Sequence, residues 1–156
     1  MSSFAEERAH THASFEFVAR APIDTVFPLF GAERERAWAP DWDPRFVWPP
    51  VAADEQGMVF TIAHGERTAV WVNTVFDRAT HRAQYVYLLP DHLVTVIEVR
   101  LTAERTAEHE AARVAVTYER TALNAAADPV VRRMADHDRA AGPEWSAQIN
   151  AYLDRP

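Results

Sequence analysis

Much of the chain alternates apolar and polar residues with a period of two, the pattern of a β-strand with one buried face. In residues 12–20, Phe15 and Phe17 fall on one side of such a strand, and Ser14 and Glu16 fall on the other. Further runs rich in β-branched and aromatic residues span 58–64, 69–76, 83–89, 93–101 and 114–121. Turn-forming residues separate these runs, and such short connections predict antiparallel neighbours.

A short segment near the N-terminus has the 3.6-residue period of a helix instead. In residues 22–30, apolar side chains fall at i, i+3, i+4 and i+7 counted from Ile23, and Pro22 suits the first turn of a helix. Pro28 removes one backbone hydrogen bond inside this segment. We therefore expect a helix that is short or bent.

The longest helical pattern covers residues 128–153, with Asp128 expected as its N-cap. Its apolar face consists of Val130, Met134, Ala141, Trp145, Ile149 and Tyr152. Because Gly142-Pro143 interrupts the pattern, we expect the helix to kink or restart there. We expect the helix to lie across the sheet and enclose a cavity, with residues 129–140 nearer the cavity mouth. On the sheet side we expect Ala141, Trp145 and Ile149.

Residues 38–50 contain three of the five tryptophans, Trp38, Trp42 and Trp48, together with four prolines. So many prolines exclude a long helix and favour a stiff, extended or turned segment. Tryptophan usually buries most of its surface, so these rings are expected to plug one end of the core or to line the mouth of a pocket.

The composition is that of an ordinary soluble globular protein, and 156 residues suffice for one domain, residues 1–156, with a buried core. The net charge of -7 argues against a nucleic-acid partner. All 16 basic residues are arginines, but they are scattered rather than gathered into one recognition patch. The alternating charges of residues 33–36 are expected to form a solvated face.

Several kinds of site are unexpected in this sequence. Without cysteine, no disulfide or cysteine-based zinc site can form. We expect no metal, because His10 and His12 have no suitably spaced carboxylate, and no cofactor, because four glycines form no phosphate-binding loop. No apolar run is long enough to cross a bilayer and residues 1–12 do not resemble a secretory signal, so a cytoplasmic protein is expected.

The order of these elements resembles the START-like superfamily, also called the SRPBCC or helix-grip group. This group includes polyketide cyclase/dehydratase-like, AHSA1-like and Bet v 1-like proteins. The similarity runs over essentially the whole chain and is carried by residues 15–18, Ala-Pro-Ile-Asp-Thr-Val-Phe at 21–27, the region of Trp38, and residues 57–60, 114–118 and 145–153.

The resemblance implies an α+β fold in which a curved seven-stranded antiparallel sheet wraps around a long C-terminal helix, with two short helices after the first strand. It also implies a hydrophobic cavity, which in relatives holds lipids, sterols, plant hormones or polyketide intermediates. The chain departs from the plant Bet v 1-type proteins at residues 38–50, where those proteins have a glycine-rich loop, so the shape of the cavity mouth does not carry over.

Alternation alone does not establish which face of each strand is buried, because a shift of one residue reverses it. Trp71 shares a face with Asn73, and Tyr85 shares one with Tyr87. The residues predicted to line the cavity are Trp38, Trp42, Phe60, His64, Trp71, Asn73, Tyr85, Tyr87, Thr95, Tyr118, Met134 and Trp145. Simple core packing remains the alternative for these aromatic residues.

Few residues point to catalysis. His64 and His92 lie beside turn-forming residues and are expected to be turn residues, and His137 on the last helix could be a general base or an ordinary surface histidine. The strand acids Glu98 and Glu119 are expected to face outward, with Arg100 and Arg120 as cross-strand partners.

Three functions remain open. The first is binding of a small hydrophobic molecule, of lipid or aromatic polyketide type, between the sheet and the last helix. The second is a cofactor-independent cyclase or dehydratase that acts in the same cavity. The third is an AHSA1-like protein-interaction role, for which the tryptophans of residues 38–50 are the only support. A homodimer through a sheet edge is possible, and nucleic acid and membrane insertion are not expected.

Overall fold

One curved antiparallel sheet forms the body of the protein in the computed structural model, which describes residues 6–156. Its strands follow the spatial order β1-β7-β6-β5-β4-β3-β2, so β1 and β2 are the two edges. The strands are β1 His10–Ala19, β2 Arg45–Trp48, β3 Val59–His64, β4 Arg67–Asp77, β5 Arg82–Leu89, β6 Leu93–Arg105 and β7 Glu110–Ala122.

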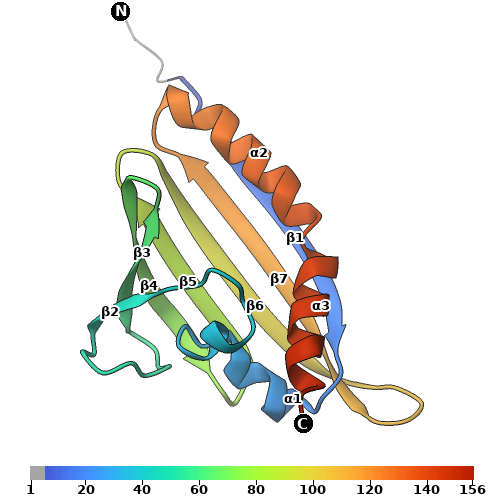
Figure 1. Cartoon of the computed structure of the whole chain (residues 1–156). Helices are drawn as coiled ribbons and strands as arrows, with labels where there is room; N and C mark the ends of the chain where they lie inside the picture. Colours follow the sequence, from blue (N-terminus) through green and yellow to red (C-terminus); the bar gives the residue numbers. More distant parts are fainter. Residues whose placement is uncertain (1–5) are drawn as a thin grey trace, which may run out of the picture.

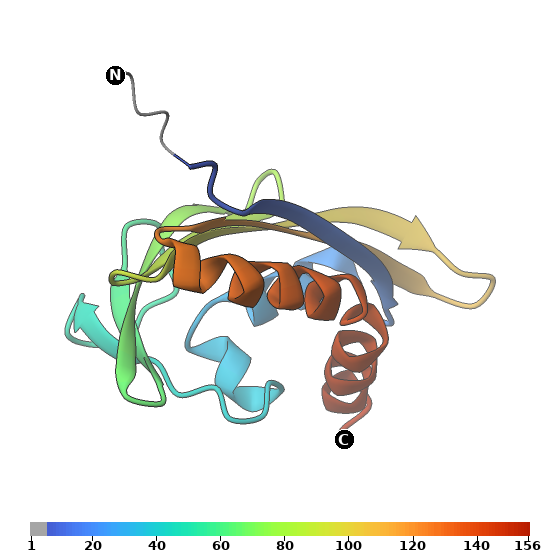
Figure 2. The same cartoon turned by 90° about the horizontal axis from the view of Figure 1, so that it is seen from above.

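The helices all lie on the concave side of this sheet, which arches over them in Figure 2. Short helical turns follow β1, and a pair of longer helices follows β7 (Figure 1). The helical segments are α1 Ile23–Val26, η1 Phe27–Phe30, η2 Arg34–Ala37, η3 Ala125–Ala127, α2 Asp128–Arg139 and α3 Gly142–Leu153, where η denotes a 3₁₀-helix. The predicted α+β helix-grip architecture is confirmed. None of the described helices is long and apolar enough to cross a membrane.

The strand register settles the faces that the sequence left open. Along β6, alternate residues from Leu93 to Leu101 are buried against the helices, and Thr95 is among them. Because Thr95 pairs with Tyr87 across β5, the two side chains share the concave face.

On the convex face, Glu98 pairs with Arg82 and Arg100, and Glu119 lies 3.0 Å from His10. The prediction that both acids face outward is correct. The proposed role of Arg120 as a surface partner is wrong, because alternation along β7 places it on the concave face, where it is buried.

The segment after β1 is helical only in short pieces, as Pro28 predicts. Four residues of α-helix end at Val26, and the next turn, Phe27–Phe30, tightens into a 3₁₀-helix. This turn buries both phenylalanines under the sheet. The following tryptophan- and proline-rich segment contains the short edge strand β2, which the sequence pattern indicated only as extended chain.

The C-terminal helical segment breaks at residues 140–141, so the predicted kink is confirmed. Pro143 lies in the first turn of α3, where its missing N–H costs no helical hydrogen bond. The expected N-cap at Asp128 is wrong: the residue before the helix is Ala127, and the Asp128 carboxylate accepts a hydrogen bond from the Ala9 backbone N–H at 2.8 Å. This carboxylate ties the start of α2 to the chain that leads into β1.

A buried ion pair fastens α2 to the sheet. Arg120 donates from Nε and Nη2 to the two carboxylate oxygens of Asp138, at 2.8 and 3.0 Å. Its Nη1 also donates to Thr95 Oγ1 at 3.0 Å and to the Tyr87 hydroxyl. Burial disfavours the guanidinium charge, but the hydrogen bonds to Asp138 outweigh it and raise the pKa of Arg120. The orientation of α2, and therefore of α3, depends on this cluster.

Candidate functional site

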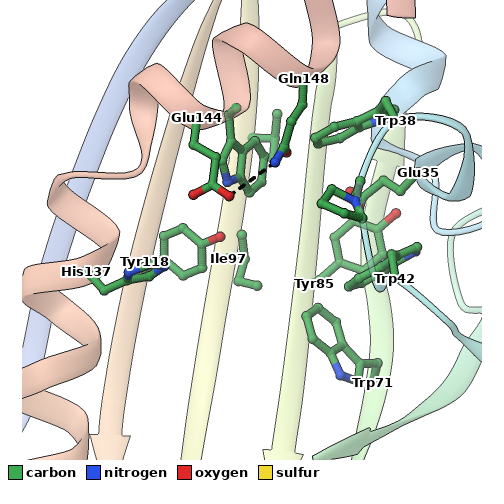
Figure 3. A pocket seen from close by; sticks show the side chains of 14 residues that line it. Glu35, Trp38, Trp42, Trp71, Tyr85, Ile97, Tyr118, His137, Glu144 and Gln148 are labelled. Carbon is green, nitrogen blue, oxygen red and sulfur yellow. Dashed lines mark hydrogen bonds between the residues drawn. The ribbon is translucent and has the colours of Figure 1, made fainter.

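A cavity of about 230 Å³ lies between the concave face of the sheet, α3 and the loop that contains η2. Sheet, helix and loop each contribute side chains to it (Figure 3). Its lining consists of Glu35, Trp38, Ala39, Pro40, Trp42, Trp71, Tyr85, Ile97, Val99, Tyr118, His137, Glu144, Trp145 and Gln148.

Half of the twelve predicted cavity residues line this space. They are Trp38, Trp42, Trp71, Tyr85, Tyr118 and Trp145. All are aromatic, and they come from β4, β5, β7, α3 and the loop before β2. The sequence signals that found them were large aromatic residues on one strand or helix face and, for Trp38 and Trp42, the tryptophan- and proline-rich segment 38–50.

Hydrogen bonds from the indole nitrogen atoms to backbone carbonyls hold two of the tryptophan rings in place. Trp38 Nε1 donates to the Leu29 carbonyl and Trp42 Nε1 donates to the Ala32 carbonyl, both at 2.7 Å. Trp38 also lies edge-on to Trp145 on α3, with 5.4 Å between ring centroids. These aromatic walls are therefore fixed before any ligand arrives.

Two of the twelve predicted residues are packed behind the cavity instead of lining it. Phe60 is fully buried and stacks on Trp71, with 5.6 Å between ring centroids. Asn73 is fully buried too, and its Nδ2 donates to the carbonyls of Val75 and Gln84. Neither residue is among those that line the cavity.

Two further predicted residues belong to the ion-pair cluster under α2. Tyr87 and Thr95 give their hydroxyl oxygens to Arg120 rather than to a ligand. His64 lies at the end of β3, exposed to solvent, and stacks on Tyr87 at 6.0 Å. Burial on that side lowers its pKa, and the charge of Arg120 lowers it further. None of these three residues lines the cavity.

Met134 does not reach the cavity either. It packs half-buried against the core from α2, and His137 is the only α2 residue in the lining. Residues 129–140 were expected to lie nearer the cavity mouth, and among them only His137 reaches the lining. The helix break turns the chain, so that α3 rather than α2 covers the cavity. Ala141 and Ile149 are buried toward the sheet and Trp145 contacts Phe15 of β1 at 5.2 Å, as expected.

The helical wall of the cavity carries polar groups that the sequence analysis missed. Glu144 and Gln148 lie one turn apart on α3, and Gln148 Nε2 donates to Glu144 Oε1 at 3.2 Å (Figure 3). Their spacing of four residues next to Trp145 was the available signal. Below them, Tyr118 points its hydroxyl into the cavity beside His137 (Figure 3).

Glu35 is the polar residue of the opposite wall. The alternating charges of residues 33–36 predicted that Glu35 lies on a solvated face, which is wrong. Glu35 lines the cavity from η2, near Tyr85 and Trp42 (Figure 3). Within residues 6–156 its carboxyl group has no hydrogen-bond or ion-pair partner. Burial raises the pKa of Glu35 well above its ordinary value, and the nearby charge of Asp54 raises it further. The signal that could have found it is its spacing of three residues from Trp38.

The turn that carries Glu35 is capped by Asp54. The Asp54 carboxylate accepts hydrogen bonds from the backbone N–H groups of Glu33 and Arg34, at 2.9 and 3.2 Å. Gly31 makes this contact possible, because a Cβ atom at Gly31 would lie 2.3 Å from Asp54 Cγ. Glycine is needed here for the close approach of a side chain rather than for an unusual backbone angle.

The two tyrosines of the cavity are neutral donors at physiological pH. Burial raises the pKa of Tyr85 and that of Tyr118, and nearby carboxyl groups add to both shifts. Tyr85 donates its hydroxyl to the Phe30 carbonyl at 2.7 Å. No partner for the Tyr118 hydroxyl is found within the described residues, so it can serve a ligand.

One further donor in the cavity wall is unpaired. Trp71 Nε1 is buried and has no hydrogen-bond partner among residues 6–156. A buried polar group without a partner costs about 1 to 3 kcal/mol. No group of three His, Asp or Glu side chains within those residues could hold a metal ion. The cavity therefore offers aromatic surface, two carboxyl groups, an imidazole, an amide and a phenol.

Comparison with known proteins gives relatives in structure but not in sequence. No family model matches the sequence, and no curated protein resembles it closely enough to count as a relative. A truncated norcoclaurine synthase from Thalictrum flavum is similar in structure, with a TM-score of 0.65 and 8% identity over 99% of this chain and 100% of that chain.

Two other solved structures are similar. Mll3558 from Rhizobium loti has a TM-score of 0.63 and 17% identity, over 95% of this chain and 100% of that chain. Ara h 8.0201 has a TM-score of 0.60 and 16% identity, over 94% of this chain and 100% of that chain. At these identities the likeness concerns the fold. The chain has the Bet v 1-like helix-grip fold.

Proposed function

We propose that this protein binds a small aromatic molecule with polar substituents in the cavity between the sheet, α3 and η2. The observation that carries the proposal is the lining itself: six aromatic side chains surround a cavity of about 230 Å³, and polar groups stand on two opposite walls. Binding sites for small molecules have this character, mostly apolar with a few placed polar groups.

The cavity volume restricts the ligand. Pockets for drug-sized molecules measure about 300 to 1,000 Å³, and an apolar cavity of about 150 Å³ accepts a molecule as small as benzene. With about 230 Å³, this cavity fits one or two rings. A sterol or a long-chain lipid would require the aromatic walls to move apart, which the hydrogen bonds of Trp38 and Trp42 oppose.

Tryptophan fluorescence offers a direct test. Four of the five tryptophans line the cavity, whereas the fifth, Trp48, is 56% exposed outside it. A Trp48→Phe variant would report almost entirely from the cavity. We expect one- and two-ring phenols and amines to change its fluorescence saturably, and sterols and fatty acids to have no effect.

Blocking the cavity provides the control. Ala39 lines it, whereas Ala37, two residues earlier, is exposed. Ala39→Phe should fill the cavity mouth and weaken binding at least about tenfold, and Ala37→Phe should leave binding unchanged. Saturable binding that is equally strong in both variants would show that the ligand site lies elsewhere.

Acid–base catalysis in the same cavity is a second candidate, favoured by Glu35. A carboxyl group whose pKa is raised by burial is suited to protonate a bound carbonyl or hydroxyl, as a general acid does. For any ligand that binds, product formation would be followed by mass spectrometry. We expect Glu35→Gln to abolish turnover without abolishing binding. If no bound ligand is converted, the protein is a binder.

The docking patch proposed for residues 38–50 loses most of its support. Trp38 is buried and Trp42 is partly buried, and both indole N–H groups are bonded internally. Only Trp48, with Val47 and Val51, remains exposed. A homodimer through the β1 or β2 edge stays a prediction, which light scattering of the purified protein would test.

A further inference from the structure

The cavity is asymmetric in charge. Two of its lining residues, Glu35 and Glu144, are acids, and no arginine is among the residues that line it. The chain has no lysine at all, and its net charge is -7. The lining therefore offers neither an arginine nor a lysine to a negatively charged ligand.

The one buried arginine near the cavity does not offset this charge. Arg120 stands behind Tyr118, with its guanidinium carbon 4.8 Å from the centre of that ring. Both carboxylate oxygens of Asp138 accept its hydrogen bonds, so the pair is neutral as a unit. Because Nη1 also donates to Thr95 and Tyr87, four of the five N–H donors of Arg120 are already used within the protein.

Aromatic rings line the cavity on the side of Glu35. Trp42 stands perpendicular to Trp71, with ring centroids 5.4 Å apart, and Trp71 lies edge-on to Tyr85 at 6.2 Å. In Figure 3, Trp38, Trp42 and Tyr85 lie on the same side of the cavity as Glu35. Faces of tryptophan and tyrosine rings attract cations, and a group of such rings is a recurrent site for ammonium groups.

We propose that the ligand of this cavity is an aromatic amine, whose protonated nitrogen is held by the Glu35 carboxylate among these rings while its own ring fills the space toward Trp145. This inference rests on the proposed binding function. The unpartnered state of the Glu35 carboxyl group explains what the ligand nitrogen would supply: a hydrogen-bond donor and a positive charge.

Binding should then release a proton. Burial raises the pKa of Glu35 in the empty cavity, and an arriving ammonium lowers it again by favouring the carboxylate, so protons pass from Glu35 to the solvent while the ammonium keeps its own. The titratable groups around Glu35 are Asp54 at the turn and Tyr85, Tyr118, His137 and Glu144 on the other walls. The tyrosines are neutral in this pH range.

A matched set of ligands on one scaffold tests the proposal. 2-Phenylethylamine, 2-phenylethanol and 3-phenylpropionate share the ring and chain but carry a positive charge, no charge and a negative charge. Isothermal titration calorimetry at pH 7 should show the amine binding at least about tenfold tighter than the alcohol, and no binding of the carboxylate. Titrations in two buffers of different ionisation enthalpy should show release of a proton with the amine only.

Two variants identify the group responsible. Glu35→Gln keeps the shape and removes the charge, and should bring the affinities for amine and alcohol to within about twofold of each other and abolish proton release. Glu66→Gln removes one negative charge from the exposed β3–β4 turn and should change nothing. Circular dichroism of each variant checks that it is folded.

The outcomes separate the two proposals. If the alcohol binds as tightly as the amine, or if Glu35→Gln keeps the preference for the amine, the inference is wrong while the binding function stands. If none of the three ligands binds, and no one- or two-ring compound quenches the cavity tryptophans, the proposed function fails and this inference fails with it.

Discussion

Removing one partner of the ion pair between Arg120 and Asp138 should destabilise the protein far more than replacing both partners with apolar residues. Each side chain is only 6% exposed, so removing one partner leaves a buried charge without compensation. We expect Arg120→Met and Asp138→Leu each to lower the free energy of unfolding by about 3 to 5 kcal/mol.

The double variant should be much less damaging than the sum of the two. It removes both charges and leaves only the hydroxyls of Tyr87 and Thr95 without their partner. A neutral hydroxyl that loses one hydrogen-bond partner costs far less than a buried charge without compensation. We expect a total loss of about 1 to 3 kcal/mol, which implies a coupling energy of at least about 3 kcal/mol.

Urea unfolding, followed by circular dichroism and tryptophan fluorescence, gives the free energy of unfolding of the wild type, the two single variants and the double variant. An equal slope of this free energy against urea concentration in all four proteins would justify the comparison. The exposed pair of Arg139 and Asp136, 3.0 Å apart on the same helix, is the control and should couple by less than about 0.5 kcal/mol. A coupling below about 1 kcal/mol between Arg120 and Asp138 would refute the view that they form a desolvated clamp.

Three further predictions concern the cavity wall. Because folded Glu35 holds its proton more tightly than unfolded Glu35, its contribution to stability is complete below about pH 4.3 and is lost as the pH rises through the folded pKa. Urea unfolding between pH 4 and 8 should therefore show a fall in stability for the wild type relative to Glu35→Gln, and parallel curves would contradict the raised pKa. Gly31→Ala would push Cβ into Asp54 and should cost about 1 to 3 kcal/mol, with weaker ligand binding by calorimetry; unchanged stability would mean that Asp54 moves freely. Trp38→Phe leaves the Leu29 carbonyl without its donor and should lower the free energy of unfolding by about 1 to 2 kcal/mol, whereas no loss would show that solvent replaces the indole.

Six of the eight tryptophans, tyrosines and phenylalanines predicted to line the cavity do so, whereas the predicted polar residues do not. Strand alternation predicts that Trp71 and Tyr85 lie on strand faces that can meet the cavity, and helical spacing does the same for Trp145. Glu35 lies in a run of alternating charges, which locally resembles any solvated surface. Its environment is created by Asp54 and Tyr85, which are 19 and 50 residues away in sequence.

The sequence alone determined the elements of this protein: alternation marks the strands, Pro28 shortens the first helix, and Pro143 divides the last helical segment. These are local effects of backbone chemistry, so neighbouring residues are enough to predict them. The tertiary structure decided which strand residues line the cavity and which are packed away from it. It also decided that Arg120 faces inward to meet Asp138, and that an acid expected in solvent stands in an aromatic cavity. Burial and charge depend on residues that folding brings together from distant parts of the chain, and no local pattern records them.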